Sequence, residues 1–149
     1  MNRQNAKPVT ILLADDDADD RELAREALEQ SRLLNTLHMV NDGEELMDYL
    51  RSRGKYAEPG AAPRPGLILL DLSMPKMDGR EALAAIKNDP SMRQIPVVIM
   101  TTSSAEEDIC RSYDLGASSF ITKPVTFPAL VEVMNGIGTY WFELVELPT

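Results

Sequence analysis

The sequence predicts one α/β domain built on a doubly wound parallel sheet. Five short apolar runs alternate along the chain with segments whose apolar residues recur at helical spacing. Such alternation is typical of a parallel sheet with right-handed crossovers and helices on both faces. Polar residues able to bind a ligand follow four of the runs, and the carboxyl ends of the strands form the edge where such sheets bind ligands.

The composition is that of a globular protein from a reducing compartment. The 149 residues, 44% of them apolar, are enough for a sizeable core. No apolar run approaches the roughly 18 residues of a membrane span, and the expected N-terminal tail, residues 1–8, lacks the apolar segment of a secretory signal. With Cys110 as the single cysteine no internal disulfide can form, which favours the cytoplasm. A net charge of −9 argues against direct nucleic-acid binding.

The first expected strand, Val9 to Ala14, leads into a stretch that contains five aspartates. Asp19 or Asp20 can cap the helix that follows, because a carboxylate at this position accepts backbone N–H groups. The second strand is expected at Thr36 to Val40, and the turn Asn41-Asp42-Gly43 leads into another helix. The apolar positions at helical spacing are Leu23, Ala27 and Leu28 in the first helix, and Leu46, Met47 and Leu50 in the second.

A long loop is expected at 52–66, because this segment is rich in Gly, Pro and Ala. About fifteen residues without secondary structure are unusual in a compact domain. Two interpretations remain for this loop: a tolerated surface insertion, or a contact surface for a partner.

The central element is the strand Leu67 to Leu70, which runs into Asp71 and then turns sharply through Pro75 and Asp78-Gly79. Four apolar residues in a row indicate a strand buried on both faces, as in the middle of a parallel sheet. Asp71 then lies at the carboxyl end of that strand. An isolated buried charge is costly, so this carboxylate requires partners.

The second half of the chain continues the alternation of helices and strands. Ser104 can cap the helix after the fourth strand, and Gly116 is a natural residue to end it. The other expected elements are a helix at about 80–87, a strand at 95–100, a strand at 118–122 and a helix at about 128–137.

The polar residues at the strand ends form a predicted phosphoryl-transfer site. Three carboxylates, those of Asp15, Asp16 and Asp71, repel one another and need a cation or protons. Oxygen ligands without His or Cys favour a hard ion such as Mg²⁺. Thr101 adds a hydroxyl donor and Lys123 a positive charge. A carboxylate nucleophile can accept a phosphoryl group while Mg²⁺ and an ammonium stabilise the charge on its oxygens.

Two other classes of protein fit these residues less well. A flavin-binding flavodoxin needs a neutral, hydroxyl- and Gly-rich phosphate loop after the first strand, where this chain has the acidic stretch 15–20. A phosphatase of the haloacid dehalogenase type needs a second aspartate two residues after its nucleophile, where this chain has Ser73. The acidic loop and the serine therefore favour a phosphoacceptor over either alternative.

The arrangement resembles the receiver domain of two-component response regulators, from Val9 to about Ile137. Each motif is weak alone, but all four in this order are highly specific. The resemblance implies a flavodoxin-like (β/α)5 fold with strand order 2-1-3-4-5 and a receiver domain over residues 9–138. The motifs that carry it are Asp15-Asp16, Leu70-Asp71-Leu72-Ser73-Met74-Pro75 with Asp78-Gly79, Thr101, and Lys123-Pro124.

The resemblance implies that Asp71 is the phosphoacceptor, which takes a phosphoryl group from a phosphohistidine of a sensor histidine kinase. It also implies that Asp15, Asp16 and Asp71 bind Mg²⁺ together with the backbone carbonyl of Ser73, and that Lys123 pairs with the phosphoryl oxygens. Many receivers carry Asn where this chain has Ser73, a difference that leaves the backbone ligand intact but can alter the dephosphorylation rate. No enzymatic activity beyond self-phosphorylation and autodephosphorylation is expected.

The same resemblance implies a conformational switch. Thr101 should move to hydrogen-bond a phosphoryl oxygen, and Phe120 matches the aromatic switch position, so that the surface of the fourth helix, fifth strand and fifth helix changes. Pro124 is expected to carry the cis peptide bond common at this position. Two alternatives stay open: Thr102 replaces Thr101 if the fourth strand ends one residue later, and Phe120 is plain core.

The loop 52–66 and the aromatic tail further resemble the single-domain regulators that partner bacterial phytochrome kinases. Residues 139–149 form an apolar C-terminal extension, and Trp141, Phe142, Leu144 and Val145 are expected to make a homodimer contact rather than fold back on the domain. No output domain that would bind nucleic acid follows, and the downstream target is expected to be a protein. The alternative function is a receiver-like scaffold that binds a partner without being phosphorylated.

The other aspartates of the acidic stretch have a plainer interpretation. Asp17, Asp19 and Asp20 are expected to act as helix caps and solvated charges rather than as ligands. His38 is expected to pack within its strand or lie at an edge, and Cys110 to be a small, at least half-buried residue of the fourth helix.

Overall fold

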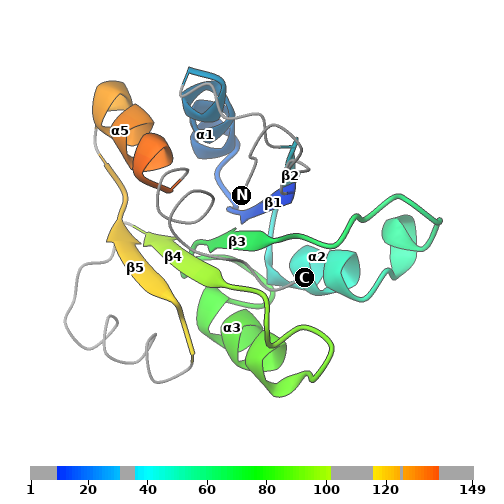
Figure 1. Ribbon diagram of the computed structural model, residues 1–149. Coiled ribbons are helices and arrows are strands. Elements are labelled where there is room, and N and C mark those ends of the chain that lie inside the picture. Colours follow the sequence, from blue (N-terminus) through cyan, green and yellow to red (C-terminus); the bar gives the residue numbers. More distant parts are fainter. Residues whose placement is uncertain (1–9, 31–35, 102–115, 125, 138–149) are drawn as a thin grey trace, which may run out of the picture.

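The structure is a computed structural model, and it describes residues 10–30, 36–101, 116–124 and 126–137. Figure 1 shows a twisted sheet with helices on both of its faces. In chain order the elements are β1 (Thr10–Ala14), α1 (Ala18–Gln30), β2 (Thr36–Val40), α2 (Gly43–Leu50), the short 3-10 helix η2 (Gly54–Tyr56), β3 (Leu67–Leu70), α3 (Gly79–Asn88), β4 (Val97–Thr101), β5 (Ser119–Thr122) and α5 (Phe127–Ile137).

The five strands form one parallel sheet in the order β2-β1-β3-β4-β5. This order confirms the predicted fold class and topology. β3 lies between β1 and β4, and all four of its residues are buried, as its unbroken apolar run predicts. Helices α1 and α5 lie on one side of the sheet and α2 and α3 on the other (Figure 1).

Side chains of each strand alternate between two apolar cores. From β1, Leu12 and Ala14 join the core that packs against α2 and α3, whereas Ile11 and Leu13 join the core that packs against α1 and α5. Both faces of the sheet are therefore used for packing. The strand ends are left to position polar groups.

The start of α1 differs from the prediction. Asp17, and neither Asp19 nor Asp20, caps the helix. Its carboxylate Oδ1 accepts the N–H groups of Asp19 at 2.8 Å and of Asp20 at 3.2 Å. Asp19 and Asp20 instead occupy the first turn, where their negative charges favour the positive end of the helix dipole.

The buried face of α1 also differs from the prediction. The helix buries Ala24, Ala27 and Leu28, which share one face at spacings of three and four residues. Leu23 lies beside this face and is 41% exposed. It is the one large hydrophobic side chain that is exposed among the described residues.

β4 begins at Val97 rather than at Ile95, and it extends to Thr101. The proline before it explains the later start. Pro96 has no N–H group to donate to the sheet, although its carbonyl accepts the N–H of Ile68 at 3.0 Å.

The loop between α2 and β3 is anchored to the domain. The hydroxyl of the buried Tyr49 donates to the carbonyl of Pro63 at 2.8 Å. Tyr56 of η2 packs edge-on against Tyr49, with ring centroids 5.1 Å apart. The Tyr56 hydroxyl donates to Glu45 at 2.8 Å, and Lys55 pairs with the same carboxylate at 2.5 Å. The loop is thus fixed against α2 by apolar and charged contacts.

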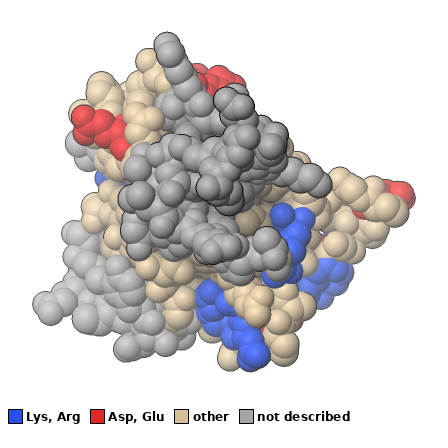
Figure 2. All heavy atoms as spheres, in the orientation of Figure 1, with Lys and Arg blue, Asp and Glu red and all other residues tan. Residues whose placement is uncertain are grey.

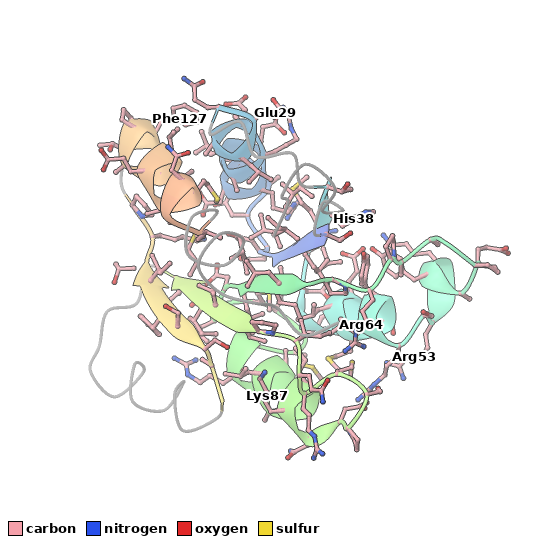
Figure 3. All side chains as sticks on the ribbon, in the orientation of Figure 1. Glu29, His38, Arg53, Arg64, Lys87 and Phe127 are labelled. Atoms are coloured by element: carbon pink, nitrogen blue, oxygen red, sulfur yellow. The ribbon has the colours of Figure 1, made fainter. Side chains whose placement is uncertain are left out.

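Basic side chains lie on the outer side of this loop and around α3. Arg64 reaches from the loop to the connection after α3, where its guanidinium donates to the carbonyl of Ser91 at 2.7 Å (Figure 3). Arg53 pairs with Asp48 at 3.2 Å. Figure 2 shows the Lys and Arg atoms of this view gathered on the side where Figure 1 places α3 and the loop.

Several predictions concern residues outside the described ranges. These are the N-terminal tail, the helix after Ser104, Thr102, Cys110 and the extension with its four expected contact residues Trp141, Phe142, Leu144 and Val145. Gly116 is described, and its φ of +105° is one that a C′ glycine adopts. In the described part of the chain no helix has the length and apolar character needed to cross a membrane.

Candidate functional site

The predicted site residues come together because they end neighbouring strands. In β1 and β3, Ala14 pairs with Leu70, so that Asp15 and Asp71 follow paired positions. The N–H of Asp71 donates to the carbonyl of Ala14 at 3.0 Å. Parallel strands end at the same edge of a sheet, and the two carboxylates therefore lie side by side.

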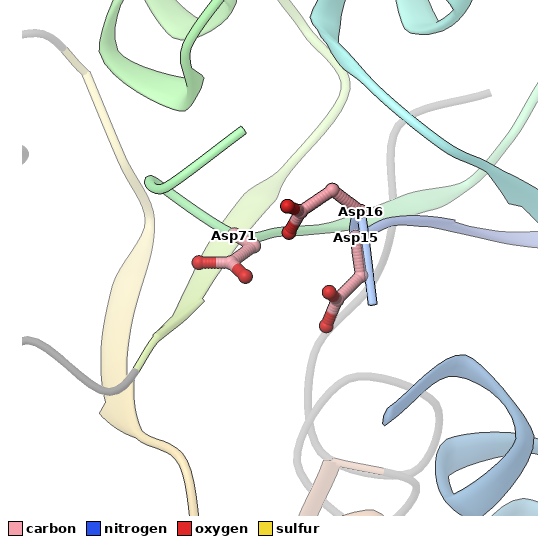
Figure 4. A group of neighbouring side chains, drawn as sticks. All are labelled: Asp15, Asp16 and Asp71. Carbon is pink, nitrogen blue, oxygen red and sulfur yellow. The ribbon is translucent and has the colours of Figure 1, made fainter. Parts of the chain in front are cut away.

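Three carboxylates converge at this edge. Asp15, Asp16 and Asp71 each offer an oxygen atom, and these oxygens lie within 4.8 Å of one another. Figure 4 shows the three side chains grouped at the ends of their strands. Asp15 is 2% exposed and Asp71 6%, whereas Asp16 is exposed to solvent. An all-oxygen donor set that is partly open to water fits a hard divalent cation.

Lys123 lies among the carboxylates. Its Nζ is 2.6 Å from Oδ2 of Asp15, 3.1 Å from Oδ2 of Asp71 and 2.9 Å from Oδ2 of Asp20. Its side chain is 14% exposed, and its backbone is tied to the end of β4, because the N–H of Lys123 donates to the carbonyl of Thr101 at 2.7 Å. The ammonium offsets part of the repulsion between the carboxylates.

Backbone groups fix the orientation of the two buried carboxylates. The N–H of Ser73 donates to Oδ1 of Asp71 at 3.1 Å, and the N–H of Asp17 donates to Oδ1 of Asp15 at 3.0 Å. The guanidinium of Arg21 donates to the backbone carbonyl of Asp15 at 2.7 Å. In each carboxylate one oxygen is therefore held by the backbone, while the other contacts Lys123.

Two pKa values of the cluster are raised, that of Asp15 mainly by burial and that of Lys123 by its carboxylate partners. Burial raises the pKa of Asp15, and the charge of Asp71 adds to the rise, against the hydrogen bonds from Lys123 and from the Asp17 N–H group. Burial alone would lower the pKa of Lys123, but its hydrogen bonds to Asp15 and Asp20 and the charges of Asp15 and Asp71 raise it above the ordinary lysine value. Lys123 therefore stays protonated among the carboxylates.

The two predicted switch residues lie on neighbouring strands. Thr101 is fully buried at the end of β4, and Phe120 is half-buried in β5, where it packs against the core next to α2 and α3. Both interpretations of Phe120 are compatible with this position. The expected cis bond before Pro124 is wrong, because no peptide bond within the described ranges is cis. The trans form is intrinsically favoured before proline, and a cis bond needs tertiary contacts to stabilise it.

Asp20 has a role in the site that the sequence did not predict. The sequence predicts that Asp20 is a helix cap or a solvated charge, but its carboxylate is a third partner of Lys123. The signal was its place in the chain, because α1 begins directly after β1 ends and its first turn therefore lies beside the carboxyl ends of the strands.

Comparisons with known proteins agree with this geometry. The family model of the response regulator receiver domain matches residues 11–135. Among curated proteins, the response regulator Rcp1 of Synechocystis sp. is 40% identical over 148 residues, which span 99% of both chains.

Two solved structures extend the similarity to the fold. The phosphorylated cyanobacterial phytochrome response regulator RcpA is 43% identical, with a TM-score of 0.87 over 96% of this chain and 100% of that one. The Mn²⁺-bound form of Rcp1 is 42% identical, with a TM-score of 0.85 over 95% of this chain and 100% of that one. That relative binds a divalent metal, the kind of ion that suits the three carboxylates here.

Proposed function

The chain belongs to the response regulator receiver family, and on this premise we propose that Asp71 accepts a phosphoryl group from a phosphohistidine of a sensor histidine kinase. One observation carries the proposal. The buried carboxylate of Asp71 lies at the carboxyl end of the central strand, 3.1 Å from Lys123 and beside two further carboxylates. A buried carboxylate with a neighbouring ammonium is placed to receive an anionic group.

The transfer is a displacement at phosphorus. The P–N bond of the phosphohistidine breaks as a bond forms between phosphorus and a carboxylate oxygen of Asp71. The imidazole nitrogen leaves with the electron pair and takes up a proton. In autodephosphorylation, water attacks phosphorus, the bond to Asp71 breaks, and inorganic phosphate and the free carboxylate are released.

We propose that the metal ion is Mg²⁺, and that Asp15, Asp16 and Asp71 would hold it together with the backbone carbonyl of Ser73. When bound, the ion supplies charge neutralisation on the phosphoryl oxygens. Within the chain, Lys123 contributes a second positive charge. The backbone N–H groups that orient Asp71 and Asp15 keep both carboxylates in place during the transfer.

The signal is a conformational change on the β4–β5 side of the domain, in which phosphorylation favours one of two arrangements. We propose that Thr101 turns its hydroxyl to the new phosphoryl oxygens and that Phe120 moves further into the core. The half-buried position of Phe120 next to the core supports this assignment, because room for a second arrangement requires a residue that is not yet fully packed.

We further propose that the donor is a phytochrome-type kinase and that the protein acts in the cytoplasm as a single-domain regulator. The similarity to Rcp1 and RcpA supports this partner. A groove between α1 and α5 opens beside Lys123 and has the exposed Leu23 and the half-buried Phe127 on its rim. An apolar rim next to the acceptor suits a protein donor better than a small metabolite.

The test is the intact mass of the wild-type chain and of Asp71→Asn after incubation with acetyl phosphate, with and without Mg²⁺. The wild type should gain a single phosphoryl group only when Mg²⁺ is present, and Asp71→Asn should gain none. Asp78→Asn is the matched control, because this aspartate caps α3 through the N–H of Glu81 and asparagine caps equally well.

A binding scaffold that is never phosphorylated is the alternative. It would be favoured if the wild type gains no phosphoryl group from acetyl phosphate or from a phosphorylated phytochrome-type kinase. An adduct that persists in Asp71→Asn would instead place the acceptor elsewhere in the chain.

A further inference from the structure

Lys123 has more carboxylate partners than its expected role requires. An ammonium group has three N–H donors. Among the described residues, the three oxygens within hydrogen-bond distance of Nζ belong to Asp15, Asp20 and Asp71. All the donor capacity of Lys123 is therefore used before a phosphoryl group arrives, and one contact has to break for Lys123 to bind a phosphoryl oxygen.

The three contacts differ in how readily they can break. The side chains of Asp15 and Asp71 are 3% and 8% exposed, and each has its other oxygen held by a backbone N–H group. The side chain of Asp20 is 38% exposed. Releasing a partly exposed carboxylate to water costs little, whereas releasing a buried one leaves an unpaired charge in the interior.

Asp20 also stands apart from the acidic cluster that suits a metal, which comprises Asp15, Asp16 and Asp71. Asp20 belongs to the first turn of α1, and Lys123 follows the last strand, β5. Their ion pair therefore links α1 to the carboxyl end of β5. Among the partners of Lys123, Asp20 is therefore the carboxylate with neither a predicted acceptor role nor a place in that cluster.

We propose that Asp20 is a positioning residue that competes with the incoming phosphoryl group for Lys123. The inference rests on the proposed function of Asp71. In the unphosphorylated protein Asp20 occupies one N–H donor of Lys123, and phosphorylation requires this donor to move to a phosphoryl oxygen. Asp20 thereby slows the transfer and acts through Lys123, without touching the reacting atoms.

The test measures the rate of phosphorylation by acetyl phosphate in saturating Mg²⁺, followed by intact mass. Asp20→Asn keeps an oxygen near Lys123 but removes its charge. It should react about threefold to fivefold faster than the wild type, the upper part of the range expected for a partly exposed ion pair. Asp20→Ala should be at least as fast. Asp19→Asn is the matched control: it removes the same charge from the same helix turn and should change the rate less than twofold.

A double-mutant cycle separates competition for Lys123 from a general effect of charge. In a Lys123→Gln background, which is slower throughout, Asp20→Asn should no longer raise the rate, because the donor for which Asp20 competes is gone. The inference is overturned if Asp20→Asn is unchanged or slower, if Asp19→Asn gives the same gain, or if the gain persists without Lys123. If the wild type forms no adduct with acetyl phosphate or with a phosphorylated phytochrome-type kinase, the proposed function fails and this inference fails with it.

Discussion

At the scale of single residues, the site depends on backbone spacing as much as on charge. Gly79 begins α3 and lies directly against the acceptor segment. A Cβ atom at this position would be 2.3 Å from the backbone oxygen of Asp71 and 2.7 Å from Cα of Leu72. Both are backbone atoms of the turn that presents Asp71, so they cannot move aside without displacing the acceptor.

Gly79→Ala is therefore expected to destabilise the fold by about 2 to 4 kcal/mol, the cost of forcing an atom into a packed interior plus the backbone shift. Urea unfolding followed by circular dichroism measures this loss. If Gly79→Ala folds, it should also take up a phosphoryl group more slowly than the wild type, because the turn that carries Asp71 is displaced.

Gly136→Ala is the matched control for this substitution. Gly136 lies in α5. Apart from its chain neighbours and the backbone of its own helix, no atom of the described residues is within 4 Å of the position of its missing Cβ. Alanine is a better helix former than glycine, so this variant should be stabilised by about 0.5 to 1 kcal/mol. Equal stability of the two variants would contradict the role of close packing at Gly79.

At the scale of elements, the long loop is held by a polar anchor on α2. Glu45 accepts hydrogen bonds from the Tyr56 hydroxyl and from the N–H of Asn41 at 2.6 Å, and it pairs with Lys55. Burial alone would raise the pKa of Glu45, but the hydrogen bonds from Lys55, Asn41 and Tyr56 lower it overall. The folded state thus favours the ionised carboxylate.

The anchor predicts a pH-dependent contribution to stability. Because the pKa of Glu45 is lower in the folded than in the unfolded state, its contribution is present above the ordinary glutamate pKa and is lost as the pH falls through the folded value. Glu45→Gln should cost about 1 kcal/mol at pH 7, measured by urea unfolding. The difference from the wild type should shrink at acidic pH, where the wild-type side chain is protonated.

Glu44→Gln controls for the loss of one negative charge in the same turn of α2, since Glu44 is exposed. It should unfold like the wild type within about 0.5 kcal/mol at every pH. A cost for Glu45→Gln that does not vary with pH would point to packing rather than to the charged contacts.

At the scale of the whole molecule, the described helices α1, α2, α3 and α5 already contribute to two separate cores, one on each side of the sheet. The C-terminal extension carries Trp141, Phe142, Leu144 and Val145, and apolar side chains gathered in one short segment favour contact with another protein surface. We therefore propose that the extension contributes to a two-fold homodimer.

A chain truncated after Gly138 should be monomeric by light scattering at concentrations where the full chain is a dimer. Removing residues 146–149 alone is the control, since it keeps all four apolar residues and should leave the dimer intact. An unchanged dimer mass after truncation at Gly138 would place the contact elsewhere, and a monomeric full chain would contradict the dimer itself.

The sequence by itself determined the fold, the strand order through the family resemblance, and the residues that gather at the sheet edge. It did so because unbroken apolar runs mark buried parallel strands and because a polar residue directly after such a run has a fixed place in a parallel sheet. Asp71 and Lys123 are far apart in the chain, yet their positions after apolar runs are enough to predict that they meet. Each follows a strand at the same edge of the sheet.

The tertiary structure alone decided the contacts that depend on the rotation of a helix or the path of a loop. α1 begins two or three residues earlier than predicted, because its cap is Asp17 rather than Asp19 or Asp20. In the folded domain Ala24 is buried in place of Leu23, and Asp20 contacts Lys123. Propensity and periodicity locate a helix only to within a residue or two, whereas each residue rotates the helix face by a large angle. Such contacts are fixed only when the helix packs against the rest of the molecule.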